Sequence, residues 1–290
     1  MHQHTHPGHD HDDPHDHGDD GQAEILDLDA EVLAEHIASI TAWLPLTSEP
    51  RRIVDLGYGT GAGTFALLER FPYAHVTAVD AAVGYLKALR EKACARGVEE
   101  RVWTVQADLD ADRWPDLGTP DLVWASASMH HMADPGRTLR KVRELLAPGG
   151  LFAVVELAGF PRFLPAHAPE NRPGLEERVH AAADALYAEH VPHRGADWGR
   201  LLVAAGFTVE DQRTITVDMD GNTDGDRDEA IARYAHVTLQ RIRGVAAGTL
   251  SPEDLAALDE ILDPDNPTSL LRREDLVVRT ERTIWAARRA

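Results

Sequence analysis

The chain has 290 residues, of which 29 are basic and 49 acidic, so its formal charge is −20, and it contains one cysteine. This length can bury a full core, either as one large domain or as a domain with a cap. The lone Cys94 excludes an internal disulfide and a zinc site of the paired-cysteine type. Nucleic acid and anionic membranes must be met by Lys and Arg, so the acidic charge argues against both as the main partner. A small molecule becomes the expected partner. No apolar stretch reaches the length of a membrane span, and we expect a cytoplasmic protein.

Residues 1–21 are low in complexity, with seven histidines and six aspartates but neither Lys nor Arg. Such a segment cannot bury an apolar face, so we expect residues 1–26 to form a disordered His/Asp-rich tail and residues 27–290 to form the domain. Imidazole and carboxylate groups bind Zn, Ni and Cu, so weak divalent-metal binding by the tail is one hypothesis. A solubilising tail or an expression remnant is the alternative. We assign no metal ligand to a catalytic site.

The first predicted helix has apolar residues at three- and four-residue steps from Val32 to Leu44, and Pro45 ends it. From Arg51 onward, short apolar strands alternate with helices. The strands are expected at 53–56, 75–80, 102–107, 122–125 and 151–157, with helices at 64–70, 82–96 and 137–146. Strands that are apolar on both faces and separated by helices predict a parallel sheet covered on both sides.

The pattern changes after Gly159. We expect helices at 175–188 and 198–205, a strand at 207–217, helices at 229–245 and 252–262, and a closing strand at 282–286. The insertion between the last two strands, about 219–275, carries helices with one apolar face. That face favours lid packing or a contact in a homodimer over a pocket.

A glycine turn, Gly57 to Gly61, follows the first strand and opens a helix. Its spacing fits a dinucleotide site as well as it fits an S-adenosylmethionine site, and a tight turn without a ligand is a third interpretation. Asp55 lies two residues before the first glycine. A carboxylate there would repel a pyrophosphate but suits a cationic ligand such as a sulfonium.

Two more carboxylates follow adjacent strands. Asp80 ends the second strand, where a carboxylate can accept both hydroxyls of a ribose. Asp108 follows the third strand and is suited to accept from an exocyclic amine. Each of the three carboxylates could instead cap a helix.

Six segments form a more specific pattern when taken together: VDLGYGTG at 54–61, VD at 79–80, ADL at 107–109, DLV at 121–123, MHHMADP at 129–135 and LLAPGG at 145–150. This set resembles the class I S-adenosylmethionine-dependent methyltransferases, in particular the small-molecule branch with the ubiquinone-biosynthesis type of domain. The resemblance covers about residues 30–160 in motifs. It implies an α/β fold with a Rossmann-like, doubly wound sheet of seven strands, the last antiparallel, plus a helical cap or insertion.

The resemblance also implies roles for individual residues around S-adenosylmethionine. Its cofactor-binding set is Asp55 at the methionine amino group, the closely approaching Gly57, Gly59 and Gly61, Asp80 at the ribose, Asp108 and Leu109 at the adenine, and Ser126 on the methionine side. Tyr58 departs from the usual small residue, and we assign it no role.

His130 and His131 follow the fourth strand, at the edge where open α/β sheets bind ligands. Methyl transfer from a sulfonium needs alignment and exclusion of water, and a base is optional. An imidazole can take the proton of a hydroxyl or amine acceptor, so both histidines are candidate catalytic residues. The alternative is that one of them caps a helix or packs beneath the loop. Whether O, N or C is methylated is left open.

The polar residues that precede and follow the fifth strand's end are weaker candidates for the substrate side: Glu156, Arg162, His167, Tyr187, His190, His193 and Arg194. The leading hypothesis is an S-adenosylmethionine-dependent methyltransferase acting on a small molecule. The alternatives are a metal-binding protein that uses its tail beside a non-catalytic Rossmann-like domain, and an NAD-dependent oxidoreductase.

Overall fold

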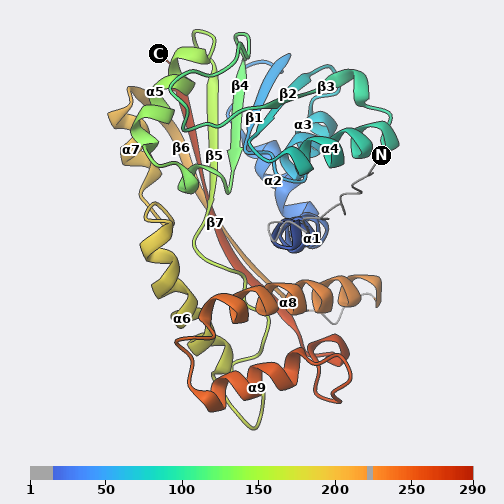
Figure 1. Ribbon diagram of the computed structural model, residues 1–290. Coiled ribbons are helices and arrows are strands. Elements are labelled where there is room, and N and C mark those ends of the chain that lie inside the picture. Colours follow the sequence, from blue (N-terminus) through green and yellow to red (C-terminus); the bar gives the residue numbers. More distant parts are fainter. Residues whose placement is uncertain (1–15, 221–224, 290) are drawn as a thin grey trace, which may run out of the picture.

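A computed structural model describes residues 16–220 and 225–289. In this part of the chain, seven strands form one sheet in the order β3–β2–β1–β4–β5–β7–β6 (Figure 1). The parallel strands are β1 (Arg52–Leu56), β2 (His75–Asp80), β3 (Val102–Gln106), β4 (Leu122–Ser126) and β5 (Leu151–Leu157). The antiparallel strand β7 (Val277–Arg289) lies between β5 and β6 (Phe207–Asp220). The predicted Rossmann-like sheet with an antiparallel last strand is confirmed.

Helices cover both faces of the sheet. On one face lie α2 (Ala34–Trp43), α3 (Ala62–Arg70) and α4 (Val83–Ala95), which share a buried apolar cluster with β1, β2 and β4. On the other face lie α5 (Pro135–Leu145) and α7 (Trp198–Ala204), which pack on β4, β5 and β7. The central strands β1, β4 and β5 are buried on both sides because they are apolar on both sides, whereas the edge strand β3 is only half-buried.

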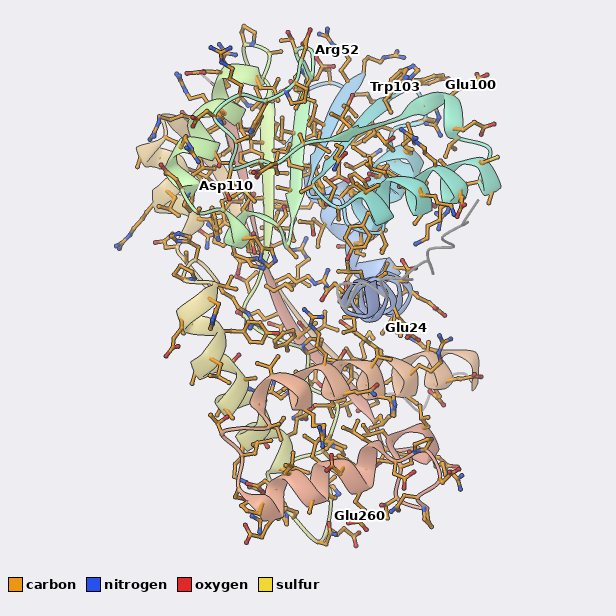
Figure 2. The ribbon with its side chains drawn as sticks, in the orientation of Figure 1. Glu24, Arg52, Glu100, Trp103, Asp110 and Glu260 are labelled. Carbon is orange, nitrogen blue, oxygen red and sulfur yellow. The ribbon has the colours of Figure 1, made fainter. Side chains whose placement is uncertain are left out.

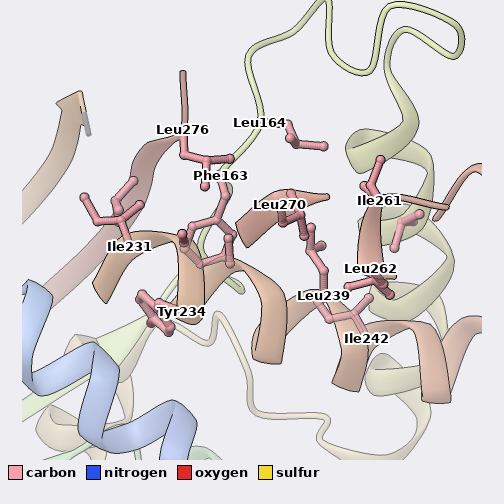
Figure 3. Packing of buried hydrophobic residues seen from close by; sticks show 14 of the residues in the cluster. Phe163, Leu164, Ile231, Tyr234, Leu239, Ile242, Ile261, Leu262, Leu270 and Leu276 are labelled. Carbon is pink, nitrogen blue, oxygen red and sulfur yellow. The ribbon is translucent and has the colours of Figure 1, made fainter. Parts of the chain in front are cut away.

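A third buried cluster lies outside the sheet. It joins α1 (Asp16–Val32), α6 (Leu175–His190), α8 (Gly225–Ala246) and α9 (Pro252–Leu262), and Phe163 packs edge-on against Tyr234 within it (Figure 3). The strands β6 and β7 are 14 and 13 residues long, whereas β1 has 5. They run beyond the other strands as a two-stranded ribbon to α8 and α9 (Figure 1). The inserted helices are thus where the sequence predicted them.

The first helix differs from the prediction. Order was expected from residue 27, in one helix, but α1 begins at Asp16 and a break at Leu33 separates it from α2. The reason is that Ile25, Leu28 and Val32 lie three and four residues apart and are buried in the cluster with α8. Residues 1–15, with most of the predicted tail and its metal hypothesis, lie outside the described residues.

The carboxyl ends of the parallel strands face α1 and the inserted helices. Arg52 begins β1 at one end of the sheet, whereas Glu24 of α1 lies beyond the other end and Glu260 of α9 lies farther still (Figure 2). Ligands of open α/β sheets bind at the carboxyl ends of the strands, which places the candidate site between the sheet edge and these helices. Within the described residues, no helix is both long and apolar enough to cross a membrane.

Candidate active site

The glycine turn joins β1 to α3 with a backbone that only glycine adopts easily. Gly57, Gly59 and Gly61 have φ angles of +67°, +53° and +95°. A Cβ on Gly57 would lie 2.5 Å from Cβ of Ser128, and one on Gly61 would lie 2.3 Å from Leu89. The turn therefore combines left-handed backbone with close packing, and both require the absence of side chains.

Asp80 ties this turn to the end of β2. Its Oδ2 accepts a hydrogen bond from the Gly59 amide at 3.0 Å, and its Oδ1 accepts from the Ala82 amide at 3.0 Å. A carboxylate has about four lone-pair sites, so these two bonds leave capacity for a ligand. The half-buried Asp80 can thus hold both the turn and a bound hydroxyl group.

Asp55 lies inside the core, with 1% of its surface exposed, and Oδ2 accepts a hydrogen bond from the Thr64 hydroxyl at 2.6 Å. Burial raises its pKa to about 7, the Thr64 hydrogen bond opposes this, and the charge of Asp80 adds to it. Thr64 belongs to the first turn of α3. Asp55 therefore links β1 to the first turn of α3, on either side of the glycine turn. The sequence analysis did not single out Thr64, its partner.

The segment that follows β4 carries a strained residue. Ser126 ends the strand, and Ala127 has φ +51°, which is uncommon for a residue with a side chain. The Ala127 amide donates to the Val155 carbonyl at 2.8 Å, and the Ser128 hydroxyl donates to the Leu56 carbonyl at 2.8 Å. These bonds hold the segment against the glycine turn, so strain and close packing coincide here, as they often do at functional sites.

Asp108 and Leu109 follow β3, the parallel strand at the edge of the sheet. Asp108 is exposed and accepts a hydrogen bond from the Asp110 amide at 2.8 Å, whereas Leu109 is 6% exposed. Gln106, two residues before Asp108, lies opposite Asp80 in the β2–β3 ladder. The predicted cofactor residues therefore follow one another along the carboxyl ends of β3, β2, β1 and β4.

His130 forms a buried pair with Glu156, the polar residue near the end of β5. Their side chains are 8% and 3% exposed, and Nδ1 of His130 lies 2.5 Å from Oε2 of Glu156. The His130 backbone amide also donates to Oε1 of Glu156 at 3.2 Å. Because an ionised carboxylate only accepts, Nδ1 carries the proton and Nε2 is left as the acceptor. Glu156 was one of several weak candidates from the sequence; it closes an otherwise apolar strand, which was the available signal.

His131 has a different environment. Its ring lies 4.2 Å from that of His130, centroid to centroid, and part of it stays exposed. Partial desolvation lowers the pKa of His131 to about 4, and the positive charges of Arg194 and Arg241, and of His130 when it is protonated, add to this effect. His131 is therefore neutral at physiological pH and a weak base, so the geometry separates two histidines that the sequence treated alike.

Comparison with known proteins places these features in a family. Residues 54–152 match the family model described as a methyltransferase domain. A malonyl-[acyl-carrier protein] O-methyltransferase from Halorhodospira halophila is 32% identical over 222 residues, which are 74% of this chain and 67% of that protein. The demethylmenaquinone methyltransferase of Thermus thermophilus is 39% identical over 41% of this chain and 53% of its own length. A trans-aconitate 2-methyltransferase from an Acidovorax strain is 40% identical over 36% of this chain and 38% of its own length.

The chain thus spans about half of the Thermus relative's length and less than half of the Acidovorax relative's length. Among solved structures, a candidate methyltransferase from Bacillus halodurans superposes with a TM-score of 0.53 at 18% identity, covering 87% of this chain and 98% of that one. The [4+2]-cyclase SpnF superposes with a TM-score of 0.50 at 19% identity, covering 88% of this chain and 80% of that one. These superpositions concern the fold, and the presence of a cyclase among them illustrates that one fold hosts several reactions.

Proposed function

Since the chain belongs to the class I methyltransferase family, we propose that it transfers a methyl group from S-adenosylmethionine to a small-molecule acceptor. The observation that carries this proposal is the glycine turn, held by Asp80 on one side and by Ser128 on the other. The relatives are named for three different acceptors, demethylmenaquinone, trans-aconitate and malonyl-[acyl-carrier protein]. What the three names share is methyl transfer, and the acceptor differs from one relative to the next.

The residues present fit S-adenosylmethionine. The turn from Gly57 to Gly61 puts left-handed, closely packed backbone at the carboxyl end of β1, and Asp80 has free lone pairs for a ribose. Asp55 and Asp80 add negative charge near the positions where the ligand carries positive charge. When bound, S-adenosylmethionine supplies a methyl group on a sulfonium that is already activated for displacement.

The remaining work of this chain is to orient the acceptor, exclude water and take up a proton. Glu156 holds His130 with Nε2 as the acceptor, so we assign removal of an acceptor proton to His130 Nε2. His131, which stays neutral, is assigned a hydrogen-bonding role beside it. The proton leaves the acceptor as its nucleophilic atom takes the methyl group, and His130 holds it as an imidazolium paired with Glu156.

Calorimetric titration with S-adenosylmethionine, S-adenosylhomocysteine and NAD tests the cofactor assignment. We expect micromolar binding of the first two and no heat from NAD, because a carboxylate at Asp55 opposes a pyrophosphate at the glycine turn. Binding of NAD alone would replace this proposal with the oxidoreductase hypothesis. The full chain and a chain without residues 1–15 should bind equally, whereas a function carried by the His-rich tail would be lost with those residues.

His130→Ala tests the proton acceptor once a panel of hydroxyl and amine acceptors has yielded a substrate. We expect turnover, measured as S-adenosylhomocysteine released, to fall about 100- to 1,000-fold, with S-adenosylmethionine affinity changed less than about twofold. Glu156→Gln is the matched variant, because it keeps the shape but removes the negative charge and leaves one oxygen for two donors, the His130 amide and Nδ1. It should lower turnover less and shift the pH–rate profile. Unchanged turnover in both variants would remove His130 from the mechanism.

A further inference from the structure

A cavity of about 360 Å³ lies beyond the end of β5, between the 158–162 segment, α6 and the β6–β7 ribbon. Its walls carry two arginines, Arg162 and Arg279, the buried His180 of α6, and an apolar surface that includes Phe160 and Val217. Neither the glycine turn nor the predicted cofactor residues contribute to it. The chemistry of the cavity therefore has to be explained separately.

The two arginines face each other across a β-bridge. Arg162 and Arg279 exchange backbone hydrogen bonds of 2.9 Å in both directions, and opposed residues of an antiparallel bridge place their side chains on one face. Within residues 16–220 and 225–289, no carboxylate oxygen lies within 4.0 Å of either guanidinium nitrogen. Arg279 donates to the Leu164 carbonyl, but its Nε and the Nη1 of Arg162 are buried without an acceptor in the protein. Asp218 lies opposite Arg279 in the β6–β7 ladder, but it is exposed and makes no ion pair with that guanidinium in the described protein. Two adjacent cations that no carboxylate contacts are suited to bind an anion.

His180 adds a third buried nitrogen. It is 1% exposed, and its Nε2 has no hydrogen-bond partner in the described protein. The carboxylate of Glu176 lies 3.8 Å away, too far for a hydrogen bond, and it already accepts from the Phe163 and Leu164 amides at 2.7 and 2.9 Å. A buried imidazole that borders a cavity and lacks a protein partner is suited to contact a ligand.

The cavity also has three carboxylates, Asp184, Asp218 and Glu281. Asp184 is paired with Arg194 at 3.6 Å, which balances its charge. Asp218 and Glu281 are exposed, so water screens them more than it screens the buried nitrogens. The groups on the buried side of the cavity that lack a partner are thus hydrogen-bond donors. The carboxylates on the exposed side can accept hydrogen bonds from an ammonium group or from water.

The cavity adjoins the proposed catalytic pair. In the β5–β7 ladder Glu156 lies opposite Thr283, and Glu281 and Arg279 follow on the same face of β7 because side chains alternate along a strand. Arg194 lies near both the cavity and the histidines. Its guanidinium is 4.2 Å above the ring of Phe160, which lines the cavity, and its charge lowers the pKa of His131. A molecule held in the cavity can therefore extend towards His130.

We propose that Arg162, Arg279 and His180 bind an acidic group, a carboxylate or a phosphate, of the methyl acceptor, and that the acceptor is a small organic acid or phosphate ester. The identification of the occupant as the acceptor rests on the proposed function, whereas anion binding by the cavity does not. A bidentate oxyanion matches two guanidinium groups placed side by side.

Titration calorimetry of the full chain at constant ionic strength tests the site, with malonate and inorganic phosphate as probes and malonamide as the neutral control. We expect the wild type to bind at least one anion and not malonamide. Arg279→Gln and Arg162→Gln should each weaken that binding at least tenfold, and His180→Gln should weaken it less. Arg213→Gln, an exposed arginine on β6, is the matched control and should bind as the wild type does.

Binding of S-adenosylmethionine by the same samples reports whether each variant is folded and separates the two proposals. Binding of malonate alone would indicate a carboxylate, and binding of phosphate alone a phosphate ester. The anion site is overturned if neither anion binds, or if all variants bind as the wild type does. Transfer of methyl groups only to acceptors without an acidic group would overturn the identification of the bound anion as part of the acceptor. Loss of S-adenosylmethionine binding with intact anion binding would count against the proposed function alone.

Discussion

The two halves of the candidate site are built in different ways. At the ends of β1 to β4, the geometry is set by the backbone: glycines with positive φ, the strained Ala127, and amide hydrogen bonds to Asp80. At β5 and beyond it, the geometry is set by side chains that different elements bring together, such as His130 with Glu156 and Arg194 with Asp184. The first half tolerates few residue types, whereas the second can change its contacts by single substitutions.

This difference shows which half each kind of mutation will damage. A backbone-built site fails when a side chain is added, because the main chain cannot move aside. A side-chain-built site fails when a partner is removed, because the other partner is left buried and unpaired. Three variants test the distinction, two of them with a matched control variant and the third against the wild type.

The largest effect is expected at the pair that joins α1 to β7. The buried Arg282 donates to both oxygens of Asp29, at 2.5 and 2.6 Å, and Tyr234 donates to the same carboxylate at 2.6 Å. Asp29→Ala leaves the guanidinium without its counter-charge, so the free energy of unfolding should fall by about 3–5 kcal/mol. Glu24→Ala breaks an exposed 3.0 Å pair between α1 and α8 and should cost less than about 1 kcal/mol. Equal denaturation midpoints for the two variants would contradict the distinction.

A smaller effect is expected from Gly57→Ala. The new Cβ would lie 2.5 Å from Cβ of Ser128 in a backbone with φ +67°, so the turn and the β4 segment must separate. Gly97→Ala provides the control, because Gly97 has φ +63° with no atom within 4 Å of an added Cβ. Both should lose about 1 kcal/mol from the backbone, and Gly57→Ala about 2 kcal/mol more from overpacking. Only Gly57→Ala should lose S-adenosylmethionine affinity; an equal loss in both would assign the effect to the backbone alone.

The smallest effect concerns pH. Burial raises the pKa of Asp55 to about 7, and a cationic ligand favours the ionised form, so binding releases a proton. S-adenosylmethionine affinity should then rise about tenfold between pH 6 and 8, and Asp55→Asn should remove that part of the rise. For the same reason, the stabilising contribution of protonated Asp55 is full below about pH 4 and is lost as the pH rises through 7. Parallel affinity profiles for wild type and Asp55→Asn would show that Asp55 does not titrate in this range.

The strands and the turn that carry the proposed cofactor residues were predictable because their determinants are local in sequence. The five parallel strands, the glycine turn and the carboxylates Asp80 and Asp108 all follow from alternating strands and helices and from the residues at strand ends. The role of Asp55 was less accessible, because its burial depends on Thr64 and Trp124 packing around it. Propensity and spacing carry no information about which side of a turn a carboxylate faces.

The acceptor half was less predictable for the opposite reason. His130 and Glu156 are 26 residues apart, and Arg162 and Arg279 meet only because the ribbon returns beside the segment after β5. The start of the first helix was also missed, because Ile25 and Leu28 gain their partners from α8, about 200 residues later in the chain. Contacts of this kind follow from the tertiary fold, and the sequence does not show which distant residues will meet.

The ribbon of β6 and β7 has a consequence for how such proteins diversify. The inserted helices enter and leave the sheet through two neighbouring strands at one edge, and the five parallel strands take no part in that connection. An insertion attached in this way can be lengthened, shortened or exchanged while the register of the five parallel strands stays the same. Acceptor choice can therefore evolve as a separable module beside the proposed methyl-donor site.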